Sequence, residues 1–251
     1  MSDNAIGLIV FVCIFGASLL GIFLRPLLSQ HHLSGDTKDS VKLGMGLVGT
    51  MAALILGLLV AAAKSAYDTE KNEVIQMAAK IAFLDRSLAS YGLESAESRA
   101  LLRRTVEGAL SRMWPDEPSH NSQLDPTVSG AEELHKAIHK LSPQNDLQRS
   151  VKAQAVGVVS ELGQLRWLLF EQSGSSISKP LLVVVILWLA IIFLSWGLFA
   201  PPNFIAIAAL LLAAVSVSGA IFLILELDQP FDGLIRIPSA PMRSALAHLG
   251  K

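Results

Sequence analysis

The sequence predicts an all-α integral membrane protein with four transmembrane helices and a helical, partly coiled-coil domain between the second and third. Hydrophobic residues make up 52% of the 251 residues and charged residues only 16%, whereas a soluble domain has about a quarter charged residues. Four uncharged stretches each have about the 20 residues that a helix needs to cross a bilayer. The chain between the second and third stretches has soluble character and helical periodicity.

The first two predicted spans cover about residues 5–24 and 44–63. Arg25-Pro26 ends the first with a charge and a helix stop, and Lys64 ends the second. The polar stretch between them, Gln30 to Lys42, is predicted to be a loop. The start of the chain lacks the basic region of a cleavable signal peptide, so we expect the first span in the mature protein.

The last two predicted spans form a hairpin within residues 180–225, a run without a charged residue or a histidine. Pro201-Pro202-Asn203 divides this run, because two successive prolines favour a sharp turn over a continuous helix. The spans are therefore expected at about 180–199 and 204–225. Residues 226–251 form a tail that begins with an acidic turn.

Residues 64–179 are predicted to form a separate helical domain. Apolar residues alternate at spacings of three and four along its first helix, which is typical of a coiled-coil seam and which Gly92 ends. Further helices are expected at about 95–113 and 132–141, with a loop over 115–130, and a long helix should run from Pro143 to about Phe170. The first seam is Val74, Met77, Ile81, Leu84, Leu88 and Tyr91, and that of the long helix is Leu147, Val151, Gln154, Val158, Leu162, Leu165 and Leu169.

The distribution of Lys and Arg favours a cytoplasmic location for both termini and the middle domain, because positive residues near membrane ends concentrate on the cytoplasmic side. The first span alone has its positive flank after it and favours the opposite orientation. The side with the middle domain carries Lys64, Lys71, Lys80, Arg166, Lys179, Arg236, Arg243 and Lys251, and the other carries Arg25, Lys38 and Lys42.

Composition and motifs argue against several function classes. The net charge of −1 argues against a nucleic-acid-binding protein, which needs a basic face. Neither a nucleophile elbow, a phosphate loop nor a dinucleotide fingerprint is present, so we expect no enzyme and no cofactor. Glu132, His135 and His139 share a face of a predicted helix. A solvated helix face explains them better than a metal site, because no further ligand follows at a suitable spacing.

Small residues recur at every fourth position of the second span: Gly49, Ala53, Gly57 and Ala61. Small side chains allow membrane helices to approach closely, so this face is either a helix-packing groove or the wall of a pore or subunit contact.

Three carboxylates, Glu226, Asp228 and Asp232, follow the last span. Glu226 and Asp228 are at the helix C-terminus, where the dipole disfavours negative charge. One interpretation is an ion pair at the membrane interface, with Lys64 as the partner of Glu226. The alternative is a cation site or the mouth of an ion pathway.

The segments Leu84–Tyr91, Arg112-Met-Trp-Pro115, Arg166–Glu171 and Glu226-Leu-Asp-Gln-Pro-Phe-Asp-Gly233 give the chain a resemblance to a family. It resembles, over nearly its whole length, a bacterial family of uncharacterised membrane proteins often called bestrophin-like. Bestrophins are pentameric anion channels with four spans and cytoplasmic helices, and they have an Asn-Pro-Phe-Gly turn after the last span. This chain differs from them in lacking an evident aromatic or Ile/Phe neck in the second span and a dense acidic run after the turn.

The resemblance implies a homo-oligomer in the bacterial inner membrane that acts as an ion channel or channel-like pore. The alternative function is a non-conducting scaffold or signalling protein whose cytoplasmic helices bind a protein partner.

Overall fold

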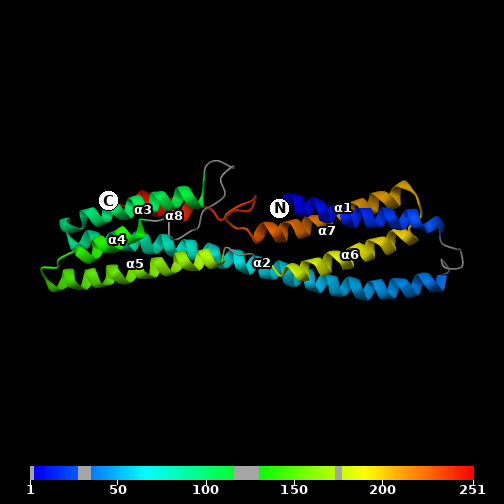
Figure 1. The fold of residues 1–251 in the computed structure, drawn as a ribbon, viewed down its shortest axis with the longest axis horizontal. Coiled ribbons are helices and arrows are strands. Elements are labelled where there is room, and N and C mark those ends of the chain that lie inside the picture. The colour runs from blue at the N-terminus through cyan, green and yellow to red at the C-terminus, as the bar shows by residue number, and fades with distance from the viewer. Residues whose placement is uncertain (1–2, 28–34, 116–129, 173–176) are drawn as a thin grey trace. The chain divides into compact units, whose positions relative to one another are not determined.

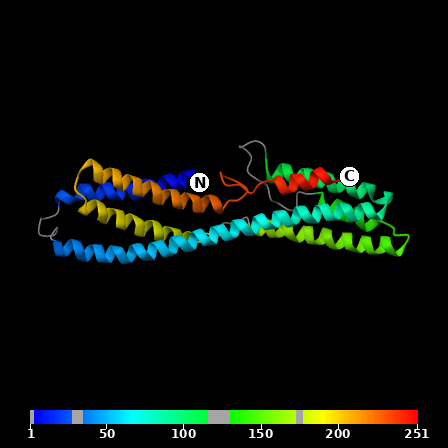
Figure 2. The ribbon, with the colours of Figure 1, turned by 180° about the vertical axis from the view of Figure 1, so that it is seen from behind.

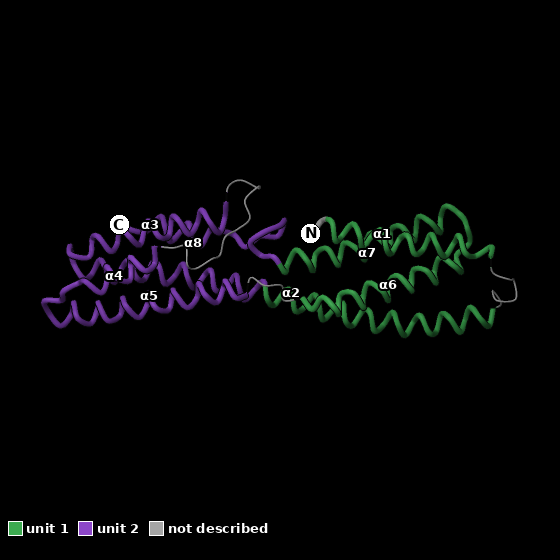
Figure 3. Tube along the Cα trace, in the orientation of Figure 1, with its two compact units in different colours: residues 1–66, 176–228 green, residues 67–175, 229–251 purple. Residues whose placement is uncertain are grey.

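The computed structural model describes residues 3–27, 35–115, 130–172 and 177–251, and every regular element in these ranges is helical (Figure 1). Residues 1–66 and 176–228 form one compact unit, and residues 67–175 and 229–251 form a second (Figure 3). The helices are α1 (Asp3–Leu24), α2 (Gly35–Tyr91), α3 (Ala96–Met113), α4 (Ala131–Lys140), α5 (Asp146–Gln172), α6 (Lys179–Phe199), α7 (Phe204–Leu227) and α8 (Ala240–His248), with short 3-10 turns η1 (Arg25–Leu27) and η3 (Leu93–Ser95).

The first unit contains α1, α6, α7 and the first part of α2. Helix α1 packs against both α6 and α7 (Figure 1). An apolar core joins all four helices, with Ile14 of α1, Leu59 of α2, Phe193 of α6 and Ile221 of α7 among its buried residues. Four helices of the described chain, α1, α2, α6 and α7, are long and apolar enough to cross a membrane.

Two glycines place α1 and α6 in backbone contact. A Cβ atom on Gly197 would lie 1.9 Å from the carbonyl oxygen of Ser18, and one on Gly21 would lie 2.3 Å from that of Leu194. No side chain larger than hydrogen fits at either place, because the clashing atoms belong to backbone that cannot rotate away. Close contact of this kind is how membrane helices gain van der Waals attraction where lipid gives no hydrophobic drive.

The turn between α6 and α7 is stabilised from both sides. Asn203 caps α7, where its side-chain oxygen accepts a hydrogen bond from the Ala206 amide at 2.8 Å. At the end of α6, the Arg25 guanidinium donates to the Ala200 carbonyl at 2.5 Å. A positive charge at a helix C-terminus is favoured by the helix dipole, so this contact also holds the end of α1 to the hairpin.

Helix α2 begins earlier than the sequence pattern predicted. Residues 35–42 were expected to be part of a loop, but they form its first turns, and residues 30–34 of that loop lie outside the described residues. The polar composition of these turns suits a helix start, because Asp36 lies in the first turn. Asp39 and Lys42 also form an ion pair at 3.3 Å.

The second unit contains the last part of α2 together with α3, α4, α5 and α8. Helices α2 and α5 run alongside one another in both views (Figures 1 and 2). They are linked by the Lys80–Glu161 ion pair and share an apolar core that includes Leu84, Leu88 and Val159. Helix α4 packs against α3 and α5, and α8 packs against α3. Of the loop expected over 115–130, residues 116–129 lie outside the described residues.

Candidate functional site

The small-residue face of α2 has few neighbours within the chain. Ala53, Gly57 and Ala61 are exposed, and a Cβ atom on Gly57 would meet no atom within 4 Å. Gly49 is half-buried, and the nearest atom to a Cβ there would be Cδ1 of Ile192 on α6, at 4.0 Å. The small face therefore remains available for a contact outside the described chain.

A different face of α2 makes the contacts with the rest of the first unit. Ala52, Leu59 and Ala63 are buried, and the last two belong to the core shared with α6 and α7. In its most apolar stretch, 11% of α2 is buried, compared with 22% to 28% for the other three candidate spans. Among these four helices α2 is thus the one least covered by its own chain.

The four residues of the predicted ion-pair or ion-mouth cluster lie on α2, at the end of α7 and in the segment after it. Glu226 is buried in the last turn of α7, and Asp228 caps that helix. Lys64 is exposed on α2 in the same unit, whereas Asp232 belongs to the second unit. A partnership between Lys64 and Glu226 stays a prediction.

The turn after α7 leads into a segment that is fixed by Trp114. The indole Nε1 of Trp114 donates to the Ile237 carbonyl at 2.8 Å, and its ring lies edge-on to Phe231 with centroids 5.9 Å apart. The amide of Ile237 also donates to the Pro230 carbonyl at 2.7 Å, and Gly233 takes a positive φ of 82°. Two of the segments that carry the family resemblance thus meet in the core of the second unit, where their aromatic residues pack together.

Two carboxylates on α2 were missed by the sequence analysis. Glu70 and Glu73 are only 4% and 6% exposed. Oε1 of Glu73 accepts a hydrogen bond from Gln172 on α5 at 3.1 Å, whereas Oε2 is buried and has no hydrogen-bond partner among the described residues. Burial raises the pKa of Glu73, although the bond from Gln172 works in the opposite direction. Extending the Val74–Tyr91 seam by four residues toward the N-terminus would have reached Glu70, whereas Glu73 is adjacent to Val74 and off the spacing of the seam.

Asp85 forms a second buried charge centre in the same unit. Its two oxygens accept hydrogen bonds from Arg99 Nε and Nη2 at 2.8 and 2.9 Å, and the Gly250 amide donates to it at 3.2 Å. Burial acts to raise the pKa of Asp85, but the bonds from Arg99 and Gly250 and the positive charges of Arg99 and Arg86 outweigh it, so the pKa is lowered. Arg99 and Arg103 also donate to the carbonyls of Lys251 and Leu249, so this centre holds the end of the described chain.

The rings of His135 and His139 on α4 have centroids 4.5 Å apart and planes tilted by 50°. Within the described ranges, the structure brings no three potential metal-ligating residues together, here or elsewhere.

The family model of the Bestrophin-like domain matches residues 12–242, which is nearly the whole chain. The chain belongs to the Bestrophin-like family. No curated protein sequence matches it. Its resemblance to solved structures is one of fold, because sequence identities are low.

Two of the solved structures with a similar fold are of variants of a bacterial bestrophin homologue from Klebsiella pneumoniae. The variant with a tryptophan replaced by alanine has a TM-score of 0.72 at 14% identity, with 99% of this chain and 97% of that chain covered. The variant with an isoleucine replaced by threonine has a TM-score of 0.71 at 14% identity, with 96% and 97% covered. A structure described as a membrane protein with a glycine replaced by alanine has a TM-score of 0.69 at 14% identity and covers 96% of both chains. The family and the apolar helices together make this chain a membrane protein.

Proposed function

We propose that this chain assembles into an oligomeric ion pore in which the small-residue face of α2 lines the pathway or the contact beside it. The observation that carries the proposal is the open space around Gly57, on the span that its own chain covers least. Exposed small residues at every fourth position would allow several copies of α2 to approach a common axis while leaving room between them. Membership in the Bestrophin-like family supports a pore, because bestrophins are channels of this architecture.

The proposed topology has four spans, with the apolar stretch 44–63 as the crossing part of α2, and places residues 64–179 and both termini in the cytoplasm. The excess of Lys and Arg on that side supports this orientation in a bacterial inner membrane. Arg25, whose position after the first span favours the opposite orientation, also has a structural role, because its guanidinium donates a hydrogen bond to the Ala200 carbonyl at the end of α6.

Charged residues at the cytoplasmic end of the spans would set ion selectivity. Lys64 follows Ala61 by three positions, so it extends the small face of α2 by one turn and would attract anions. The buried Glu226 and the adjacent Asp228 would favour cations if they reached the pathway. Lys64→Gln should therefore lower the ratio of anion to cation permeability, and Glu226→Gln should raise it if the acidic end forms part of the mouth.

Ion flux and assembly mass test the proposal together. The chain purified in detergent should have the mass of a ring of several copies, and liposomes that contain it should pass ions that protein-free liposomes retain. A monomer, or a stable oligomer without flux, would contradict the pore and favour a scaffold role for the cytoplasmic helices.

A further inference from the structure

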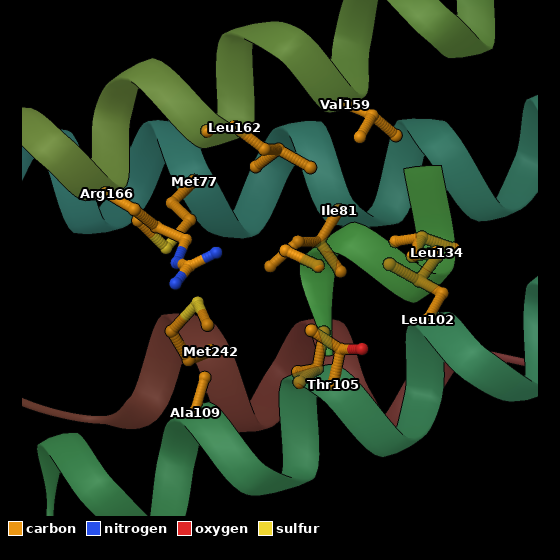
Figure 4. A pocket seen from close by; sticks show the side chains of 13 residues that line it. Met77, Ile81, Leu102, Thr105, Ala109, Leu134, Val159, Leu162, Arg166 and Met242 are labelled. Carbon is orange, nitrogen blue, oxygen red and sulfur yellow. The ribbon is translucent and has the colours of Figure 1, made fainter. Parts of the chain in front are cut away.

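Two histidines lie one turn apart on α4, a helix whose neighbouring face is fixed in the core of the second unit. Leu134 and Ile138 of that face are buried, and Leu134 lines a cavity in the core (Figure 4). His135 is half-buried and His139 is exposed. Because residues four positions apart share a face of an α-helix, both imidazole rings are within reach of the same ion in solution.

The two rings already have a separation that suits a shared metal ion. Their centroids are 4.5 Å apart. Two imidazoles that bind one ion at about 2.0–2.1 Å, with a right angle between the two bonds, have centroids roughly 4.5 Å apart. Within the described residues, neither ring makes a hydrogen bond through a nitrogen atom. Turning the rings toward an ion therefore breaks no hydrogen bond.

The backbone of the second histidine is held in place from α5. Nζ of Lys152 donates hydrogen bonds to the carbonyls of His139 and Leu141 at 2.7 and 2.8 Å. Lys136, which lies between the histidines in the sequence, forms an ion pair with Glu132 at 3.6 Å. This pair offsets a positive charge beside the histidines, and the dipole favours a cation near the C-terminus of a helix.

We propose that His135 and His139 form a chelate site for a first-row transition-metal ion, with Cu²⁺ bound most tightly. Imidazole is a favoured ligand of Cu²⁺, Ni²⁺ and Zn²⁺, and affinity at a given site is highest for Cu²⁺. A right angle between two ligand bonds also suits the tetragonal geometry of Cu²⁺ better than the tetrahedral geometry of Zn²⁺. No third ligand lies beside the histidines among the described residues, so water would complete the coordination.

The bound ion would stabilise α4. A helix of 10 residues is marginal on its own, and this one depends on its packing against α3 and α5. An ion that bridges His135 and His139 links the last two turns of the helix, so it binds the folded helix in preference to the unfolded chain. Cu²⁺ should therefore stabilise the second unit, whether or not the protein conducts ions.

Calorimetric titration of the full chain, purified without a histidine tag, tests the site with Cu²⁺, Ni²⁺, Zn²⁺ and Mg²⁺ as probes. Cu²⁺ should bind most tightly, and Mg²⁺, which prefers oxygen ligands, should not bind. His135→Gln and His139→Gln should each weaken Cu²⁺ binding roughly a hundredfold, because the remaining imidazole loses a second ligand at high effective concentration.

Two further measurements report on the ligands and on α4. Electron paramagnetic resonance of bound Cu²⁺ should show coupling to two imidazole nitrogens in the wild type and to one in either single variant. Cu²⁺ should also raise the midpoint of thermal unfolding of the wild type, and it should leave the midpoints of the two variants unchanged.

A shifted histidine is the matched control for the spacing. The double variant His139→Gln, Lys140→His keeps the number of histidines but moves the second ring off the shared face, so it should bind Cu²⁺ as weakly as His139→Gln. His248→Gln removes an exposed histidine of α8 and should bind like wild type. All of these proteins should also carry His31→Gln and His32→Gln, because adjacent histidines could bind Cu²⁺ elsewhere in the chain.

Three results would overturn the site: no saturable binding of Cu²⁺, binding that both single variants leave unchanged, or wild-type affinity in the double variant with the shifted histidine. Circular dichroism should show equal helix content in all variants before titration. If His135→Gln does not fold, the exposed position decides alone, because equal Cu²⁺ affinity of His139→Gln and wild type would equally contradict the proposal.

Discussion

At the scale of single residues, the pair of Asp85 and Arg99 makes the largest stability prediction. Asp85 is 3% exposed, and removing its charge would leave the Arg99 guanidinium without its two-pronged partner. Asp85→Asn should therefore lower the free energy of unfolding by roughly 3 kcal/mol, as for other broken buried pairs. Chemical denaturation of the purified chain measures this, with Asp146→Asn as the control.

The control removes one partner of an ion pair at the protein surface, where Asp146 and Arg149 lie 2.5 Å apart with both side chains largely exposed. Such pairs contribute little, so Asp146→Asn should unfold like wild type. Equal effects of the two substitutions would show that the Asp85 pair is not a buried stabilising contact.

The effect of Asp85→Asn should also shrink below about pH 4. Because the pKa of Asp85 is lowered, its contribution is present above the ordinary value and is lost as the pH falls through the folded value.

Glu73 should depend on pH in the opposite way. Its pKa is raised above the ordinary 4.5 by burial, so the folded state holds the proton more tightly than the unfolded state, and stability is lost as the pH rises through this window. Glu73→Gln should therefore raise the midpoint of thermal unfolding at pH 7.5 and have no effect below about pH 4. Glu171→Gln changes an exposed carboxylate of α5 and should leave the midpoint of thermal unfolding unchanged at both pH values. A lower midpoint for Glu73→Gln at pH 7.5 would mean that the charged form has a stabilising partner.

Only some of these buried residues and contacts could be predicted from the sequence. Trp114 and Phe231 were recognised only as parts of family segments, because their contact joins positions 117 residues apart in the chain. The burial of Glu70 and Glu73 was missed because a charged residue ahead of an apolar seam is normally solvated. Asp85 belongs to the Leu84–Tyr91 segment of the family resemblance. Its ion pair with Arg99 could not be predicted, because it depends on the turn at Gly92 that brings α3 back along α2.

At the scale of elements, the contact between α1 and α6 should tolerate no side chain. Gly197→Ala would place a methyl group inside the backbone of Ser18, so the helices must separate and lose the attraction between them. The variant should be roughly 1–3 kcal/mol less stable, as for other overpacked sites. Thermal unfolding in detergent measures the effect against Gly16→Ala, whose added methyl meets no atom within 4 Å. Equal midpoints for the two variants would refute the close contact.

The helix seams show how far periodicity predicts burial. All six residues of the Val74–Tyr91 seam are buried, and α2 ends at Tyr91, before Gly92 with its positive φ of 121°. The burial of this seam and the end of its helix are therefore confirmed. The seam of α5 was partly wrong, because Leu147 and Gln154 are exposed and Ala155 and Val159 are buried in their stead. Helix α5 contacts α4 as well as α2, so the face it buries is wider than a two-helix seam.

At the scale of the whole molecule, the proposed topology can be tested with single cysteines in a Cys13→Ala background. Asp39→Cys should react with a membrane-impermeant thiol reagent in intact cells, because the chain between the first two spans is expected outside the cytoplasm. Glu133→Cys, at an exposed position of α4, should react only after the cells are opened. The reverse pattern would invert the orientation derived from Lys and Arg. Ser34 and Ser122 would also report on the two loops, but they lie outside the described residues.

The sequence predicted the helical class and the family of the molecule, because long uncharged runs and local segments carry that information. It left open whether the small face of α2 packs inside the chain. Small residues suit a close helix contact as well as an open pathway. The structure packs another face of α2 against α6 and α7, so a pathway or a contact between copies at the small face stays a proposal.

The most direct test of the central claim is ion flux through a variant with a larger side chain at the proposed pathway. In liposomes, Gly57→Leu should abolish or strongly reduce the flux, because its side chain would enter the space that the small face leaves open. Gly16→Leu adds the same side chain at an open position of α1 and should conduct like wild type once equal assembly is verified. Flux through Gly57→Leu equal to that through Gly16→Leu, in assemblies of the same size, would contradict a pore lined by α2.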